Sequence, residues 1–221
     1  MKPFPVNFQL ILFKFLFLHY LRRLTGRLWL SDQSELGFSK KGLDLILKQS
    51  WDKYSKSVLE SDKQANLGNW MVMNFAHLTL GAFQVLIEQG SFEQDAINLI
   101  YKLTWEITST WTKRAKRFSG VIFREPKREL AYFVDLVMKT FFSPPAYLFD
   151  TGEINNGFFL DVKRCPVAEL MATNGVSDLC IQTWYRVDFG LVKIIGGSLE
   201  REGTLAMGRD KCDFVFLHES R

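Results

Sequence analysis

The chain has 221 residues, of which 47% are hydrophobic and 24% are charged, and its formal net charge is +4. This composition is that of an ordinary globular protein with a substantial core, and it excludes a disordered chain. The net charge is too small to indicate nucleic acid as a partner. Three cysteines cannot all pair, and their spacing is not that of a secreted disulfide framework. We therefore expect a cytoplasmic protein whose cysteines are thiols or ligands.

The N-terminal segment, residues 1–30, is apolar and basic. Residues 8–21 read FQLILFKFLFLHYL, with Lys14 inside the stretch and Arg22 and Arg23 after it. The stretch is shorter than the roughly 20 residues that span a bilayer, and no small-residue cleavage site of a signal peptide follows it. It is either a helix buried against the rest of the protein or an interfacial helix whose cations favour anionic lipid. The second interpretation predicts a membrane-peripheral protein.

Residues 31–150 are predicted to be a helical region. Apolar residues recur at helical spacing in three stretches of this region, at 39–59, 67–89 and 129–142. The second stretch is apolar nearly all round, which is typical of a central core helix. Gly90 can close it in a left-handed conformation, and residues 96–107 then carry one apolar face, so we expect an αα-hairpin. The basic run KRAKR at 113–117 is a solvated helix end or an anion-binding patch.

Residues 151–221 are predicted to be a cysteine-containing α/β region. The alternation of residues 157–164 predicts a strand. Short helices are expected at 167–174 and 178–187, and a hairpin of two strands at 198–204 and 211–217. In the last strand Cys212 and Asp213 point to opposite faces, because side chains alternate along a strand. The predicted fold class is α+β: an N-terminal helical part packed on a C-terminal α/β region with a small antiparallel sheet, with 31–150 and 151–221 in one compact unit.

The sequence contains no nucleophile elbow, phosphate loop or dinucleotide fingerprint. Three histidines are too few for a His-rich metal site. His77 lies in the middle of an apolar predicted helix, where a core histidine and a residue that binds a ligand are both open interpretations.

The three cysteines are the candidates for chemistry. A thiolate becomes a nucleophile when a cation or a helix N-terminus lowers its pKa, and Lys163 and Arg164 directly precede Cys165. Cysteines such as Cys180 and Cys212 can equally be zinc ligands. A third interpretation is that all of them are buried as small hydrophobic residues.

Short segments in the second half of the chain follow one another in a characteristic order. They are FLDVKRCPVAE at 159–169, Leu179-Cys180, Asp188, REGTLAMG at 201–208 and KCDFVF at 211–216. Together they resemble the L-2-amino-thiazoline-4-carboxylic acid hydrolase family, to which the helical layout at residues 77–96 is also similar. The resemblance covers about residues 60–217 and implies a hydrolase that opens a cyclic amidine-type C–N bond in a small-molecule substrate.

Such a reaction needs a nucleophile or activated water, a proton-transfer group and a stabiliser of the developing charge. The candidate catalytic residues are Cys165, Cys180, Asp188 and Asp213, and the candidate substrate-binding residues are His77, Arg201 and Thr204. We expect Cys165 or Cys180 to be the nucleophile or a metal ligand. The planar fork of Arg201 suits a substrate carboxylate. The structural alternatives are that Asp213 caps the hairpin and that Arg201 pairs with a surface acid.

A resemblance to a second group of proteins implies a possible metal site. A cysteine followed by a hairpin that contains another cysteine is similar to 4-vinyl reductase-like small-molecule-binding domains, and this implies zinc held by cysteines and a carboxylate. Cys180 and Cys212 are the candidate ligands for a divalent metal, either zinc or manganese. Arg201 and Thr204 stand where an acidic residue and a further cysteine would be expected. The rival function is a non-enzymatic module that binds a small molecule in the same pocket or acts as a membrane-peripheral adaptor.

Overall fold

The computed structural model describes residues 23–26, 39–59, 66–122 and 126–218. Most of the predicted N-terminal helix therefore lies outside the described residues, although residues 23–26 are helical. Whether residues 1–30 are buried or contact lipid stays a prediction.

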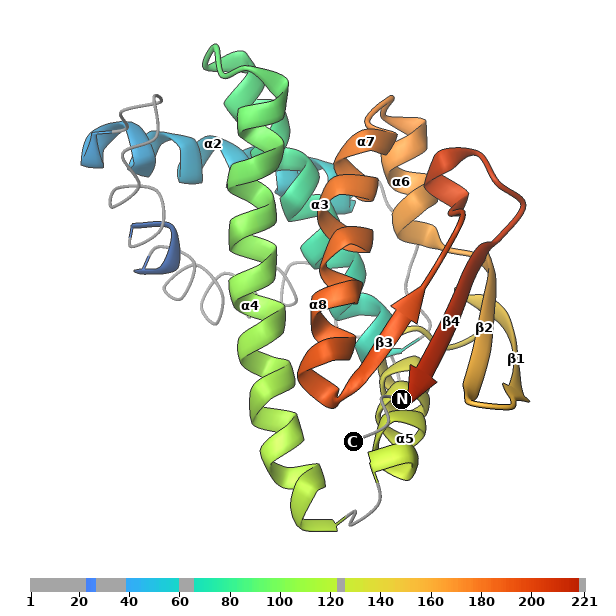
Figure 1. The fold of residues 1–221 in the computed structure, drawn as a ribbon. Helices are drawn as coiled ribbons and strands as arrows, with labels where there is room; N and C mark the ends of the chain where they lie inside the picture. Colours follow the sequence, from blue (N-terminus) through green and yellow to red (C-terminus); the bar gives the residue numbers. More distant parts are fainter. Residues whose placement is uncertain (1–22, 27–38, 60–65, 123–125, 219–221) are drawn as a thin grey trace. The chain divides into compact units, whose positions relative to one another are not determined.

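The first half of the described chain is helical, as predicted (Figure 1). Its helices are α2 (Lys40–Leu59), α3 (Leu67–Glu88), α4 (Glu93–Ile122) and α5 (Pro126–Phe141). Each prediction at 39–59, 67–89 and 129–142 is confirmed to within three residues. The apolar periodicity was strong enough to place these helices without tertiary information.

The predicted αα-hairpin is confirmed between α3 and α4. Gly90 has a φ of +86°, and its N–H donates to the carbonyl of Ile87 at 2.9 Å. The N–H of Ser91 donates to the carbonyl of Leu86 at 3.0 Å. These bonds satisfy the last carbonyls of α3, and the left-handed backbone suits glycine. Glu93 then places an acidic side chain in the first turn of α4, where it complements the helix dipole.

Among the described residues, α3 is the one helix that is long and apolar enough to cross a membrane. Length and composition alone give this result, and 67% of the most apolar window is buried within the protein. Burial to that extent is typical of a core helix, as its all-round apolar pattern predicts.

The second half of the chain adds a four-stranded antiparallel sheet, which confirms the α+β class. Its strands are β1 (Leu148–Ile154), β2 (Gly157–Arg164), β3 (Gly197–Glu200) and β4 (Cys212–His218), in the order β1-β2-β4-β3. Phe158 of β2 faces Phe216 of β4, and their rings stack with centroids 4.8 Å apart. Cys212, Phe214 and Phe216 share the buried face of β4, as alternation predicts.

A second group of helices connects these strands. α6 (Pro166–Thr173) follows β2, and residues 177–195 then form one continuous helix made of α7 (Ser177–Leu179), a π-helical turn (Cys180–Tyr185) and α8 (Arg186–Ile195). The predicted helix at 178–187 is therefore right in place but too short. Gly190 weakens the helical pattern, but a Cβ at that position would overlap the ring of Trp105 on α4. The glycine thus permits close helix packing.

The described contacts divide the chain into two compact units. The first contains residues 1–62 and 77–103, and the second contains residues 63–76 and 104–221. All four strands and helices α5 to α8 belong to the second unit, in which α5 packs on β2, β4 and α8. The division of the chain at residue 150 stays a prediction.

Candidate functional site

The π-helical turn determines how two side chains of the second unit are aimed. Cys180 and Tyr185 are five residues apart, so in an α-helix they would point about 140° away from each other. In a π-helix the hydrogen bonds run from residue i to i+5, which brings such residues to the same side. Both side chains are buried. Within the turn, the hydroxyl of Thr183 donates to the carbonyl of Leu179 at 2.5 Å.

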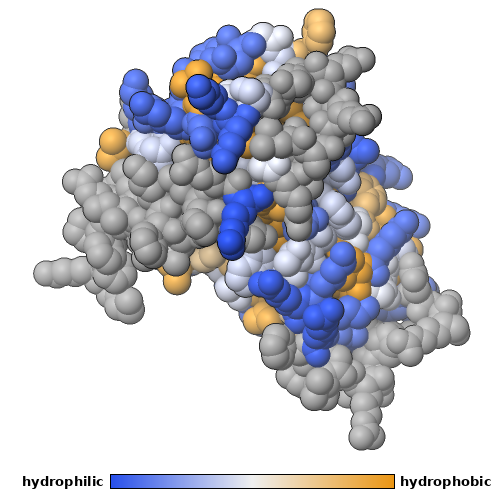
Figure 2. Space-filling model, turned by 90° about the vertical axis from the view of Figure 1, so that its left-hand side faces the viewer, coloured by the Kyte–Doolittle hydropathy of each residue, from blue (hydrophilic) through white to orange (hydrophobic). Residues whose placement is uncertain are grey.

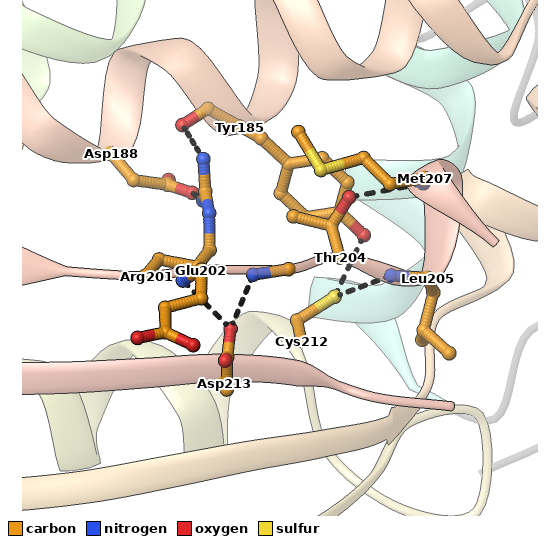
Figure 3. A network of polar contacts seen from close by, with 10 residues as sticks. Tyr185, Asp188, Arg201, Glu202, Thr204, Leu205, Met207, Cys212 and Asp213 are labelled. Atoms are coloured by element: carbon orange, nitrogen blue, oxygen red, sulfur yellow. Dashed lines mark hydrogen bonds and ion pairs between the residues drawn. The ribbon is translucent and has the colours of Figure 1, made fainter. Parts of the chain in front are cut away.

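A chain of hydrogen bonds joins Tyr185 to the C-terminal hairpin (Figure 3). The backbone N–H of Leu205 donates to Sγ of Cys212 at 3.3 Å, and this thiol donates to the hydroxyl of Tyr185 at 3.2 Å. Thr204 is fully buried, and its hydroxyl accepts from the N–H of Met207 at 3.2 Å. Thr204 therefore caps the 3₁₀ turn that presents the Leu205 amide to Cys212.

Cys165 reaches the same cluster from another element. It is the residue that immediately precedes α6, and it is half-buried, whereas Cys180 and Cys212 are buried. Burial raises the pKa of Cys165 to about 11. The backbone amides of Ala168 and Val167 and the Tyr185 hydroxyl act in the opposite direction on this pKa.

The other two thiols are also held in their neutral form. Burial and the neighbouring thiols of Cys165 and Cys212 raise the pKa of Cys180. Burial raises the pKa of Cys212, although the Tyr185 hydroxyl and the Leu205 amide, which can donate to its thiolate, act against this. The structure thus brings the three predicted cysteines together around one tyrosine.

Arg201 and Asp188 form a partly buried ion pair beside the thiols (Figure 3). Nη1 of Arg201 lies 3.1 Å from Oδ2 of Asp188, and Nη2 donates to the carbonyl of Tyr185 at 3.1 Å. The guanidinium also lies over the rings of three aromatic residues, namely Tyr185 at 5.0 Å, Phe189 at 4.8 Å and Phe214 at 5.2 Å. With 6% of its side chain exposed, Arg201 is held firmly. Its use as a carboxylate anchor stays a prediction.

Asp188 has an unusual acidity for a carboxyl group with a cationic partner. Burial raises the pKa of Asp188 to about 7, and the charge and hydrogen bond of Arg201 oppose this shift. Although 32% of the side chain is exposed, protein surrounds the carboxyl group closely enough for burial to dominate. Both protonation states are therefore accessible near neutral pH.

Asp213 lies on the face of β4 opposite Cys212. Its Oδ1 accepts from the backbone amides of Glu202 and Gly203 at 3.2 and 2.8 Å. These contacts make Asp213 a cap of the hairpin, which is the structural alternative that the sequence left open. Its catalytic role stays a prediction.

His77 belongs to the first compact unit. Its Nδ1 lies 2.6 Å from the hydroxyl of Ser57, and burial lowers its pKa to about 4. Its Nε2 is buried and has no hydrogen-bond partner among the described residues. The ring is therefore neutral at physiological pH, and substrate binding by His77 stays a prediction.

The basic run at 113–117 lies within α4, which continues to Ile122, so its placement at a helix end was wrong. Lys116 donates to the carbonyl of Ile194 at 2.6 Å, at the C-terminus of α8, where a cation suits the helix dipole. Lys113, Arg114 and Arg117 are exposed. Among the coloured residues in Figure 2, hydrophobic residues form small separate spots between hydrophilic ones.

The residues that the structure describes do not fit the predicted metal site. They contain no group of three or more His, Cys, Asp or Glu side chains that could hold a metal ion. Of the two predicted ligands, Cys212 already accepts one hydrogen bond and donates another. We therefore assign no chemical step to zinc or manganese.

Two tyrosines of this region were missed in the sequence. Tyr185 lies three residues before Asp188 on the same helix, a spacing that could have indicated it. Tyr147 is fully buried, its hydroxyl has no partner among the described residues, and burial together with Cys165 and Cys180 raises its pKa. No pattern in the sequence pointed to Tyr147.

Comparison with known proteins gives a family match that includes the residues of this candidate site. A family model described as L-2-amino-thiazoline-4-carboxylic acid hydrolase matches residues 72–216, which include all three cysteines, Asp188 and Arg201. Neither the curated proteins nor the solved structures give a significant match. The matched range covers more than half of the chain and agrees with the motifs recognised in the sequence. This chain therefore belongs to the L-2-amino-thiazoline-4-carboxylic acid hydrolase family.

Proposed function

We propose that the protein is a hydrolase that opens a cyclic amidine-type C–N bond in a small-molecule substrate, with Cys165 as its nucleophile. The observation that carries this proposal is the position of Cys165. It is the only one of the three cysteines that is partly exposed, and it precedes α6, whose amides at Val167 and Ala168 act against the rise in pKa that burial causes. Family membership supports the class of reaction.

The proposed reaction adds one water across the ring bond. The thiolate of Cys165 forms a bond to the amidine carbon, the C–N bond to the ring nitrogen breaks, and that nitrogen takes up a proton. Water then attacks the same carbon, and the sulfur leaves to regenerate the thiol. Asp188 is the group of the cluster whose pKa lies near neutrality, which suits a proton donor and acceptor.

Exchanging single cysteines tests the proposal. We expect Cys165→Ser to lower turnover of L-2-amino-thiazoline-4-carboxylate by about a thousandfold or more, because the hydroxyl is a much poorer nucleophile. Cys180→Ser, a matched change at a buried thiol of the same cluster, is expected to keep turnover within about tenfold. Unchanged turnover in Cys165→Ser would remove this residue from the mechanism, and loss in Cys180→Ser alone would assign the nucleophile to Cys180.

A non-enzymatic binding module is the second candidate, and one observation favours it. Burial holds all three thiols and the Tyr185 hydroxyl in their neutral forms, so the cluster needs no reaction to explain it. A binder would be thermally stabilised by cyclic amidines without consuming them. Melting curves and product analysis on the same samples separate the two functions.

A further inference from the structure

The end of β2 carries a β-bulge, which decides the side chains that face the interior there. Leu148 of β1 pairs with Arg164, and the next residue of β1 pairs two positions earlier on β2, with Val162. Lys163 is therefore an extra residue, and a bulge of this kind shifts the alternation of side chains by one. The burial of the strand agrees with this shift, because Lys163 and Arg164 are both exposed and Cys165 returns to the partly buried side.

Tyr147 lies opposite Cys165 across this pair of strands. The antiparallel register ends at the pair of Leu148 and Arg164. Tyr147 and Cys165 are the next residue on either side, and Cys165 still has an extended backbone, with φ −139° and ψ 105°. Side chains that lie opposite each other on antiparallel strands point to the same face. Tyr147 and Cys165 therefore share the face of the sheet on which Cys212 is also buried.

The hydroxyl of Tyr147 is buried without a partner. Tyr147 is 1% exposed, and none of the described residues forms a hydrogen bond with its hydroxyl. Its ring makes an edge-to-face contact with the ring of Phe142, with centroids 5.1 Å apart, and its N–H donates to the carbonyl of Ser143 at 3.4 Å. An unpaired buried hydroxyl is unfavourable, because it has lost its hydrogen bonds to water and gained none. Such a group in a folded protein needs an explanation other than stability.

The Tyr147 hydroxyl is suited to donate to a ligand. Burial, followed by the thiols of Cys165 and Cys180 and the carboxylate of Glu169, raises the pKa of Tyr147 well above its ordinary value. The phenol therefore stays protonated near neutral pH and has one proton to donate. Cys165 is partly exposed, so a small molecule that approaches this thiol from solvent comes next to Tyr147.

We propose that Tyr147 and Cys165 are the two sides of a binding site for a small cyclic amidine, in which the O–H of Tyr147 donates to the ring nitrogen. The ligand supplies the partner that the hydroxyl lacks in the free protein. Because the hydroxyl is covered there, the side chains around it must move as the ligand enters past Cys165. In the proposed hydrolysis this bond holds the nitrogen of the breaking C–N bond, and the phenol proton stays on Tyr147. The inference rests on the proposed function only for the class of the ligand.

Two substitutions of buried tyrosines test the state of the hydroxyl in the free protein. Tyr147→Phe removes an unpaired hydroxyl, so the midpoint of urea denaturation is expected to stay the same or to rise. Tyr185→Phe is the matched control, and it should lower the midpoint, because the Tyr185 hydroxyl lies 3.2 Å from Sγ of Cys212. If Tyr147→Phe loses as much stability as Tyr185→Phe, or fails to fold, the hydroxyl has a partner within the protein and the proposal is overturned.

Ligand binding is measured with 2-aminothiazole, an aromatic cyclic amidine whose ring resists opening. Isothermal titration calorimetry of the full-length protein at pH 8 gives its Kd. We expect Tyr147→Phe to raise this Kd by about tenfold, because the bound nitrogen loses its hydrogen bond to the hydroxyl. An unchanged Kd would overturn the proposal, and so would the absence of binding by the wild type.

Protection of Cys165 shows whether the ligand lies beside this thiol. The wild-type protein is treated with iodoacetamide, and modification of Cys165 is followed by peptide mass spectrometry. Saturating 2-aminothiazole is expected to slow this modification several-fold. Modification at an undiminished rate would place the ligand elsewhere and contradict the proposed site.

These measurements do not depend on turnover, which Cys165→Ser tests separately. If Cys165→Ser keeps full turnover while Tyr147→Phe weakens binding, the proposed nucleophile is wrong and the binding site stands. If Cys165→Ser loses turnover while Tyr147→Phe binds as the wild type does, the hydrolase proposal stands and the binding site is wrong.

Discussion

Asp188 makes the stability of the protein depend on pH in a direction opposite to that of most carboxylates. Its pKa is raised from 3.8 to about 7 by burial. Between these values the folded protein keeps a proton that the unfolded chain releases, so the free energy of unfolding falls as pH rises through this window and levels off above pH 7. Protonated Asp188 can still accept from Arg201 through its carbonyl oxygen.

His77 has the opposite effect: it makes the free energy of unfolding rise with pH, over a range of pH that overlaps that of Asp188. Burial lowers its pKa from 6.5 to about 4, so its stabilisation is present above pH 6.5 and is lost as the pH falls toward 4. The two slopes partly cancel in the wild type. Asp188→Asn removes one of them, and we expect the free energy of unfolding of this variant to fall more steeply than that of the wild type from pH 6.5 to pH 4.5.

Urea denaturation at several pH values measures both slopes. Above about pH 7, Asp188→Asn also leaves Arg201 without its anionic partner, which lowers stability there. The slope with pH is therefore the diagnostic quantity, not the stability at one pH. Parallel curves for the variant and the wild type would contradict a raised pKa at Asp188.

These residues also show what the sequence could and could not predict about the site. The opposite faces of Cys212 and Asp213 follow from the period of a strand, and the structure confirms them. The alignment of Tyr185 with Cys180 was not predicted from the sequence. A π-helical turn shifts the helical period by one residue, and an α-helical pattern does not place these two residues on the same side. The pairing of Arg201 with Asp188 joins a helix to the end of a strand, a contact that only the tertiary fold brings about.

The elements with strong internal patterns were predicted nearly residue by residue. β2 was placed at 157–164 because its apolar and polar residues alternate, and these are its observed bounds. β1 was missed because it is an edge strand without a buried residue, so it carries no such alternation. The helix predicted at 178–187 stopped short of the end of α8 at Ile195. The missed part contains Gly190, which permits close packing of the Trp105 ring.

The start of α3 packs closely against the end of α5 and is joined to the residues that follow it by hydrogen bonds. The side-chain Nδ2 of Asn69 donates to the carbonyl of Ser143 at 3.0 Å, and Oδ1 of Asn69 accepts from the N–H of Ser143 at 3.2 Å. Gly68 lies beside this junction, and a Cβ there would collide with the backbone carbonyl of Thr140. A backbone atom cannot move aside as a flexible side chain can, so only glycine fits.

We therefore expect Gly68→Ala to lower the free energy of unfolding by about 2 kcal/mol or more, although alanine is the better helix former. Gly42→Ala in α2 is the matched control. A Cβ at Gly42 would meet only the Ser39 hydroxyl, at an ordinary 3.4 Å, so this change should be neutral or stabilising by up to about 1 kcal/mol. Chemical denaturation of both variants gives the comparison, and equal stabilities would show that the junction can relax.

The family and the α+β class were recognisable from the sequence because both depend on the order of local motifs along the chain. The gathering of Cys165, Cys180 and Cys212 was not, because it depends on how α6, the π-helical turn and β4 meet in the second compact unit. The same limit applies to the metal prediction, which treated two cysteines as ligands without knowing that one of them already bonds to Tyr185.

The apolar and basic segment 1–30 raises the question of where the protein works in the cell. We propose a cytoplasmic protein that contacts membranes peripherally through this segment, on the basis of its cations at Lys14, Arg22 and Arg23 among apolar residues. The full-length chain is then expected to sediment with vesicles that contain anionic lipid and not with neutral ones. The association should weaken as salt is raised, because salt screens the attraction between charges.

Charge reversal distinguishes this segment from the other basic stretch of the chain. Arg22→Glu with Arg23→Glu should abolish sedimentation with anionic vesicles, since each cation near such a surface contributes about 1 kcal/mol. Lys113→Glu with Arg114→Glu is the matched control, because it reverses two exposed cations on α4. Loss of binding in the control alone would assign the contact to α4. Absence of binding in the wild type would instead favour a helix buried within the protein, which is the alternative that the sequence left open.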